Sequence, residues 1–194
     1  MKRKAGTVCI GLGIVLLFAS MSLFLWNRWE ERQAEKAAEE ILPGLLEAIE
    51  PPDKVSDPYD PEMTVKEIDG YGYIGYLSIP SSGLELPVMS EWDYKRLKIA
   101  PCRYAGSVKT DNFVIAAHNY ARHFRPLWKI PVGEIVYFTD MDGIRYSYTV
   151  SEVETLSPTA VEDMTSGEYD LTLFTCTYGG KTRVTVRCER TEGS

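Results

Sequence analysis

The chain has 194 residues, which is enough for one domain and an appendage. Apolar residues make up 44% of it and charged residues 25%, as in ordinary globular proteins. A formal net charge of -7 argues against a nucleic-acid partner, because such a partner binds a basic surface.

The N-terminus has the pattern of a membrane anchor. A basic cluster, Lys2–Lys4, precedes an uncharged apolar run at residues 7–26. About 20 such residues span a bilayer as a helix, and Trp26 and Trp29 follow where indole rings favour the interface. The basic cluster predicts that residues 1–6 stay cytoplasmic and that the remainder faces outward. A cleaved signal peptide is the alternative, but this run is longer than the usual apolar part of one.

The next segment, residues 27–68, is expected to be a helical stalk followed by a linker. Its first half is rich in Glu, Ala, Arg and Lys, which are good helix formers, and we interpret it as a solvated stalk without chemistry. Pro43-Gly44 is expected to kink or split that helix. Prolines and acidic residues fill the second half, which is typical of a linker with little structure.

From about residue 69 to 190 the sequence is typical of a domain made mainly of β-strands, followed by a tail at 191–194. A short helix is expected at Trp92–Lys98, and Met141-Asp142-Gly143 indicates a hairpin turn. Many short strands separated by turns favour a closed or nearly closed β-barrel. The expected strands are Tyr73–Ile79, Leu84–Val88, Phe113–Ala117, Glu134–Asp140, Ile144–Val153, Leu171–Cys176 and Arg183–Glu189.

The four cysteines give no metal-binding pair. Cys9, Cys102, Cys176 and Cys188 are too far apart for a CxxC motif, so a structural zinc site is not expected. Cys9 falls in the apolar run. The other three are either all free or include a Cys102–Cys188 disulfide, since the sequence does not supply the distance between them.

A cysteine nucleophile needs an accessible sulfur, a proton shuttle within hydrogen-bond reach and a donor for the negative oxygen of the intermediate. Cys176 ends an expected strand, His118 follows a buried one, and Arg183 begins a strand after a glycine turn. If the strands of Cys176 and Arg183 form a hairpin, the two residues lie at the same end. Arg187 is the rival arginine and His123 the rival base. By residue type alone, each of these residues is more often structural than catalytic.

Sequence motifs add a resemblance. The segment Leu171–Cys176 reads LTLFTC and resembles the T-L-x-T-C signature of sortases. The segment Arg183–Arg187 reads RVTVR and resembles the strand that opens with the sortase arginine. Ala117-His118-Asn119 resembles the strand-end histidine, and Tyr73–Val88 resembles the first strand pair of the family. These motifs stand in family order over roughly 120 residues, the size of one domain.

The resemblance implies a fold and an activity. Sortases are extracytoplasmic enzymes, mostly of Gram-positive bacteria, with an eight-stranded β-barrel. They cut a sorting motif of the LPxTG type between Thr and Gly and hold the acyl fragment as a thioester. The fragment then passes to an amine on a lipid-linked cell-wall precursor or a pilin lysine.

Carried to this sequence, the resemblance assigns a role to each site residue. Cys176 is the nucleophile, His118 is the general acid and then the base, and Arg183 donates to the oxyanion. Thr175 is expected to help position substrate.

The class of sortase is less determined. The short stretch Leu156–Tyr169 leaves no room for the long helix of class B enzymes, whereas His118-Asn119 resembles class B. Asp57-Pro58-Tyr59 resembles the lid of pilus-forming enzymes, or is an ordinary turn. We favour a class D- or A-like enzyme over class B or C.

No cofactor or metal is expected. Some sortases use Ca²⁺ held by acidic loops, and four acidic side chains are available here, but acids in loops are usually just solvated; they are Glu152, Glu154, Glu162 and Asp163. Two other functions stay open: a non-catalytic membrane-anchored adaptor that binds a peptide or wall component, and a cysteine hydrolase without transfer.

Overall fold

The computed structural model describes residues 2–49, 51 and 62–191. The Asp57-Pro58-Tyr59 motif lies outside the described residues. The chain divides into two compact units, one up to Gln33 and one from Ala34 onward. A single long helix, α1 (Lys2–Ala48), supplies the first unit and the beginning of the second.

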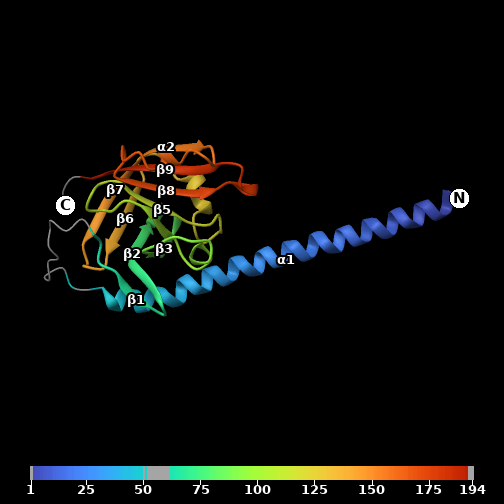
Figure 1. Cartoon of the computed structure of the whole chain (residues 1–194), viewed down its shortest axis with the longest axis horizontal. Helices are drawn as coiled ribbons and strands as arrows, with labels where there is room; N and C mark the ends of the chain where they lie inside the picture. Colours follow the sequence, from blue (N-terminus) through green and yellow to red (C-terminus); the bar gives the residue numbers. More distant parts are fainter. Residues whose placement is uncertain (1, 50, 52–61, 192–194) are drawn as a thin grey trace. The chain divides into compact units, whose positions relative to one another are not determined.

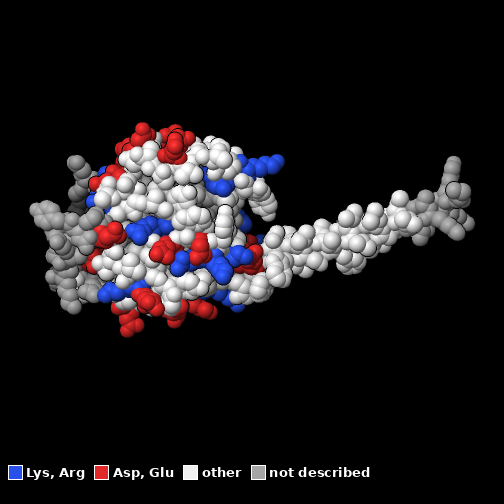
Figure 2. Space-filling view, in the orientation of Figure 1, with Lys and Arg blue, Asp and Glu red and all other residues white. Residues whose placement is uncertain are grey.

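In the first unit, α1 is covered by apolar side chains. Six of them that are exposed are Val8, Ile10, Leu12, Leu17, Phe18 and Leu25. Figure 2 shows an uncharged surface along this part of the helix. Trp26 and Trp29 pack on each other at its end, with ring centroids 5.6 Å apart. This segment has the length and composition of a membrane-spanning helix, as the sequence predicts; a signal sequence has them too.

In the second unit, the last turns of α1 are not a solvated stalk. Ala34, Ala38 and Leu45 have at most 4% of their surface exposed, so one side of the helix is packed against the barrel. The helix also continues through Pro43 to Ala48 without being split. Proline removes one backbone donor, and tertiary packing around Leu45 compensates for that loss. The expectation of a fully solvated stalk is therefore wrong from Ala34 onward, and Pro43 does not split the helix.

The second unit is a closed β-barrel (Figure 1). Eight strands run in the order β2-β3-β4-β5-β8-β9-β7-β6, and pairing of β2 with β6 closes the ring. The eight-stranded barrel implied by the resemblance is confirmed, and a short β1 adds to the edge of β2. The strands are β1 (Lys66–Ile68), β2 (Tyr71–Ile79), β3 (Leu84–Met89), β4 (Cys102–Ala105), β5 (Phe113–Ala116), β6 (Ile135–Asp140), β7 (Arg145–Leu156), β8 (Leu171–Cys176) and β9 (Arg183–Arg190).

The closing seam between β2 and β6 depends on Gly75. A Cβ atom at this position would lie 2.1 Å from the carbonyl oxygen of Thr139, and the residue has a φ of +144°. Only glycine allows both the close approach and this backbone conformation. Gly75 therefore lets the two strands meet.

Helical segments in the second unit are short. The segment expected as a helix at Trp92–Lys98 contains only a 3₁₀ turn, η2 (Arg96–Lys98). The other short segments are η1 (Pro80–Ser82), η3 (Arg125–Lys129), α2 (Val161–Met164) and η4 (Tyr178–Gly180). Strand β1 falls inside the expected linker, and β4 has no counterpart among the expected strands.

Apolar side chains pack on both faces of β5. Phe113 and Ile115 join one core cluster, while Val114 and Ala116 join another that also contains Leu45. A strand buried on both faces is continuously apolar rather than alternating, which explains the run before His118. This rigid strand holds the histidine in place.

The two core clusters also separate two cysteines. Cys188 belongs to the cluster that contains Phe113, and Cys102 belongs to the one that contains Val114. Both thiols are free and fully buried. A Cys102–Cys188 disulfide is therefore absent from the structure.

Candidate active site

His118 and Cys176 follow from the register of two neighbouring strands. β5 and β8 run parallel, with Ala116 paired to Phe174. His118 follows two residues after Ala116, just as Cys176 follows two residues after Phe174, and both residues line the same cavity. The hydroxyl of Thr175 donates to the carbonyl of Ala117 over 2.8 Å and ties the two strand ends together. Parallel pairing thus brings the strand ends that carry the imidazole and the thiol to the same cavity.

Arg183 is placed by the hairpin between β8 and β9. Cys176 pairs directly with Arg183 across these antiparallel strands. The connecting loop is closed by a 2.8 Å hydrogen bond between the hydroxyls of Thr177 and Thr182. Nη1 of Arg183 donates to the carbonyls of Gly180 and Thr182, each at 3.1 Å. The guanidinium is therefore held at the end of the barrel that carries the thiol.

These three side chains line one cavity of about 230 Å³. Cys176, His118 and Arg183 are all half-buried, which leaves the thiol accessible. Most of the remaining lining is apolar and comes from four parts of the barrel; it includes Trp92, Tyr94, Leu97, Tyr104, Met164 and Phe174. We name this space the apolar cavity.

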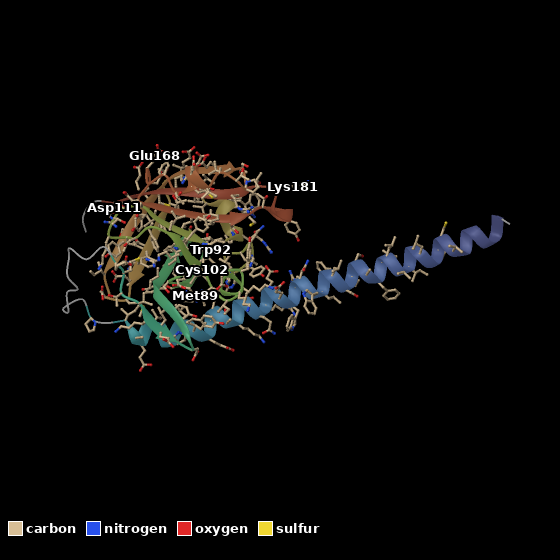
Figure 3. All side chains as sticks on the ribbon, in the orientation of Figure 1. Met89, Trp92, Cys102, Asp111, Glu168 and Lys181 are labelled. Atoms are coloured by element: carbon tan, nitrogen blue, oxygen red, sulfur yellow. The ribbon has the colours of Figure 1, made fainter. Side chains whose placement is uncertain are left out.

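Aromatic contacts give the apolar cavity a firm wall. Tyr104 packs edge-on against Phe174 at 5.1 Å and against Trp92 at 5.3 Å, measured between ring centroids. Figure 3 shows Trp92 on the same part of the barrel as Met89 and Cys102, at the meeting of β3 and β4. Apolar and aromatic lining of this kind is typical of ligand-binding pockets.

A second cavity, of about 400 Å³, also reaches Cys176. We name it the loop cavity, because loops supply most of its lining: Asn119, Arg125, Trp128, Thr175, Thr177, Tyr178 and Val184 with the cysteine. Trp128 is 60% exposed and Tyr178 is 91% exposed. Lys181 lies in the loop that joins β8 to β9 (Figure 3). Cys176 therefore lines both cavities.

The surroundings of the barrel's cysteines single out Cys176. Burial, with a smaller effect from Asp93, raises the pKa of Cys102 to about 12, and burial also raises the pKa of Cys188. Neither thiol reaches solvent or forms a thiolate at neutral pH. Cys176 is the accessible sulfur of the described barrel.

Comparison with known proteins identifies the family. Residues 77–191, more than half of the chain, match the family described as sortase domain. The chain belongs to the sortase family. It is 30% identical over 135 residues to sortase A of Bacillus anthracis, an alignment that covers 63% of this chain and 61% of that protein. This sortase thus spans less than two thirds of the length of the curated relative.

Solved sortases share the fold. Sortase C1 from Streptococcus agalactiae is 28% identical with a TM-score of 0.58, covering 66% of this chain and 72% of that one. Sortase A from Corynebacterium diphtheriae has the same TM-score at 23% identity, covering 64% and 63%. These relatives carry the names of two classes, so the similarity shows the family and does not select the class.

The rival site residues lie elsewhere in this sortase. Arg187 is 3% exposed; its Nε contacts Glu154 at 2.7 Å and its Nη2 donates to the carbonyl of Asp163. It joins α2 to the barrel and does not line either cavity at Cys176. His123 is fully buried and also lies outside both cavities.

The acidic residues considered for calcium have other contacts. Glu152 accepts a hydrogen bond from the hydroxyl of Tyr169 at 3.1 Å, while Glu154 pairs with Arg187. Glu162 and Asp163 lie in the first turn of α2. Across the described residues, no group of three or more His, Cys, Asp or Glu side chains is arranged to hold a metal ion.

The cavity walls were not predicted from the sequence. Trp92 and Tyr94 line the apolar cavity, and Trp128 and Tyr178 line the loop cavity. Large aromatic side chains in polar segments without strand periodicity were the signal available. Thr175 lines both cavities, and its hydroxyl donates a hydrogen bond to the carbonyl of Ala117.

Proposed function

We propose that this protein is a cysteine transpeptidase that cleaves an LPxTG-like motif between Thr and Gly and transfers the acyl fragment to an amine. One observation supports the proposal: the thiol of Cys176, the imidazole of His118 and the guanidinium of Arg183 line one cavity. Family membership supports this reading of the geometry.

In the first half-reaction, the Cys176 thiolate attacks the carbonyl carbon of the motif threonine. The new C–S bond produces a tetrahedral oxyanion, to which Arg183 donates; since Nη1 is engaged with the loop, Nε and Nη2 are the donors we assign. Imidazolium His118 gives its proton to the glycine nitrogen as the C–N bond breaks. The product is a thioester on the cysteine and a free amine.

In the second half-reaction, an acceptor amine attacks the thioester carbon. Neutral His118 removes a proton from the attacking nitrogen, the C–S bond breaks, and the thiolate of Cys176 is restored. An imidazole beside the sulfur serves both halves, because the incoming and leaving amines occupy the same side of the carbonyl. Thr175 acts as a positioning residue through its bond to Ala117.

The two cavities suit the two substrates. The apolar cavity has aromatic walls and ends at the thiol, and we assign it to the acyl part of the motif. The loop cavity reaches the same sulfur from the other side and is the approach that we assign to the amine. Its exposed rings, Trp128 and Tyr178, offer flat surfaces for peptide groups.

The cellular setting follows from α1. We propose that the apolar segment anchors the protein in the membrane with a cytoplasmic N-terminus and an extracytoplasmic barrel, supported by the basic cluster before it. The donor is then a protein with a sorting motif, and the acceptor a lipid-linked wall precursor or a pilin amine. The four-residue α2 agrees with a class D- or A-like enzyme rather than class B.

Mass spectrometry of the full chain in detergent tests the proposal. Incubation with a panel of LPxTG-like peptides should add the acyl fragment to Cys176, and added amines should remove it as a new amide. Cys176→Ala should show neither product. Absence of any acyl-enzyme with every peptide supports a binding adaptor, and an acyl-enzyme that yields only acid supports a hydrolase; each result overturns the proposal.

A further inference from the structure

The loop that follows His118 is internally bonded. The amide of Phe124 donates to the carbonyl of His118 at 3.2 Å, and the amides of His123 and Arg125 donate to the carbonyl of Tyr120 at 3.0 and 3.1 Å. Nη2 of Arg125 also donates to the carbonyl of Asn119. The loop therefore moves as one piece, and whatever holds it also holds the histidine.

Three rings connect His118 to the interior. Its imidazole lies 4.9 Å from the ring of Tyr120 at an interplanar angle of 32°. Tyr120 in turn lies 5.5 Å from the ring of His123, at 54°. His123 is fully buried. His118, the general acid and base of the proposed reaction, thus packs on Tyr120, which in turn packs on the buried His123.

His123 occupies an unusual position for a polar ring. Neither of its nitrogens has a hydrogen bond of normal geometry within the part of the chain that the structure describes. Burial, and next the proximity of His118, lower its pKa to about 4, while a long backbone hydrogen bond with Ala34 of α1 acts in the opposite direction. A buried polar group without such bonds lowers the stability of the fold. We therefore infer that His123 contributes by positioning its neighbours rather than by stabilising the fold.

The last turns of α1 hold the other side of this loop. Ala34 and Ala38 are at most 4% exposed, and their small side chains allow the helix to approach closely. Nε of Arg122 contacts Glu35 of α1 at 3.0 Å, and its Nη2 lies 3.6 Å from Glu39. Arg122 immediately precedes His123. The helix therefore contacts the loop at two neighbouring residues: the guanidinium of Arg122, through ion pairs, and the buried ring of His123.

We propose that residues 34–39 of α1 belong to the catalytic apparatus, because through Arg122 and the Tyr120–His123 ring pair they hold His118 in its working position. This inference rests on the proposed function. Glu35, Arg122, Tyr120 and His123 are positioning residues, since none of them lines either cavity at Cys176. Small displacements of a catalytic group cost large factors in rate, so the docked helix sets the rate of proton transfer.

A charge reversal tests the grip of the helix. Arg122 is more than half exposed, so Arg122→Glu leaves the core intact but places three carboxylates together. In the full chain in detergent we expect kcat for acyl transfer to fall about tenfold, with the KM for the sorting peptide unchanged. Adding Glu35→Arg to Arg122→Glu should restore most of kcat. Glu47→Arg makes the same charge change as Glu35→Arg at an exposed position further along the helix, so it is the matched control for that second substitution: added to Arg122→Glu, it should not restore kcat.

Substitutions of Tyr120 test the ring contact. Tyr120→Leu should lower kcat about tenfold with KM unchanged, and Tyr120→Phe, which keeps the ring, should restore it. Thermal unfolding measured on every variant separates this effect from lost folding.

The outcomes distinguish the two proposals. If the wild type forms no acyl-enzyme, the proposed function fails. If the wild type reacts and both Arg122→Glu and Tyr120→Leu react equally fast, only this inference is overturned. A loss of kcat in Arg122→Glu that Glu35→Arg does not restore also overturns it.

Discussion

The two cavities that meet at Cys176 differ in how they are built. The apolar cavity is backed by strand residues, including Tyr104 of β4 and Phe174 of β8, and by the segments between strands that carry Trp92 and Met164; its reactive groups lie on strands or directly after one. The loop cavity is walled by loops and 3₁₀ turns, and its largest side chains, Trp128 and Tyr178, are mostly exposed. Rigid strands thus fix the groups that need exact placement, while loops present the surface that must admit a second substrate.

The largest expected effect concerns the strand-built side. Arg183→Ala removes the oxyanion donor, and we expect the rate of acyl-enzyme formation to fall by about 10²- to 10³-fold. Binding of the peptide to the apolar cavity should change little, because Arg183 is one of many lining residues. Single-turnover mass spectrometry measures the rate of acyl-enzyme formation. Peptide titration of Cys176→Ala, with and without Arg183→Ala, measures binding. If Arg183→Ala weakened peptide binding and left the rate of acyl-enzyme formation unchanged, Arg183 would act in recognition and the prediction would be wrong.

The second prediction concerns the pH dependence of stability, and it tests the loop that contains His123 and supplies Asn119 and Arg125 to the loop cavity. The pKa of His123 is about 4 when folded, against an ordinary 6.5, so the unfolded chain binds more protons between these values. Stability is then fully present above pH 6.5 and falls by about 3 kcal/mol as pH drops to 4. His123→Phe should lack this part of the slope. Urea unfolding of both proteins across this range measures it.

Other polar and charged groups surround His123. His118 and Tyr120 face it from its own loop, Arg122 is adjacent, and Glu35 and Glu39 approach from α1. These groups are common to both proteins, so the comparison uses the difference between the two slopes. Equal slopes would show that His123 is not neutral and buried in solution.

The third prediction separates the substrates of the two cavities. Trp128→Ala should lower the transfer of the acyl group to triglycine about tenfold, since a buried aromatic contact is worth more than ~1 kcal/mol. Transfer to hydroxylamine, which is too small to need the loop cavity, should not change. Tyr94→Ala should instead slow acyl-enzyme formation and leave the triglycine-to-hydroxylamine ratio as it is.

A donor peptide that ends at the motif glycine keeps the loop cavity free during the first step. Val132→Ala, an exposed apolar residue just after η3, is the matched control for Trp128. If Trp128→Ala and Tyr94→Ala lower both steps equally, the cavities do not serve separate substrates.

The smallest expected effect comes from the tie between the strand ends. Thr175→Val keeps the shape but removes the hydrogen bond to Ala117, a bond worth about 1 kcal/mol. We expect kcat to fall about fivefold for transfer to triglycine and hydroxylamine alike, because the change affects the chemistry that both share. Steady-state assays with each nucleophile check this. A selective effect on one nucleophile would place Thr175 in recognition instead.

Sequence patterns predicted the strand-built part of the molecule well. The strand Leu171–Cys176 has the expected bounds, and the start of the next strand at Arg183 was also found. These strands are apolar and bounded by turns, and their motifs identified the three residues that the structure brings together. β4 was not found, because Cys102–Ala105 is short and carries polar residues, and β1 lies in a segment that reads as linker.

The loop-built part was predicted poorly for a physical reason. Ala34 and Ala38 are ordinary helix formers in sequence, and only tertiary contact reveals that they are buried. His123 was considered a loop residue because its neighbours are polar and basic, yet the fold turns it inward. Aromatic residues such as Trp128 carry no periodic signal in an irregular segment. Contacts between distant segments, rather than local pattern, decide these positions.

The burial of Cys102 and Cys188 has a consequence for oxidative damage. Each sulfur is enclosed in a separate core cluster, so within the barrel neither can act as a resolving thiol for Cys176. When a peroxide converts Cys176 to a sulfenic acid, no other thiol of the barrel can therefore protect it by forming a disulfide. Recovery then depends on a small thiol supplied from outside, and without one the enzyme proceeds to the irreversible sulfinic and sulfonic acids.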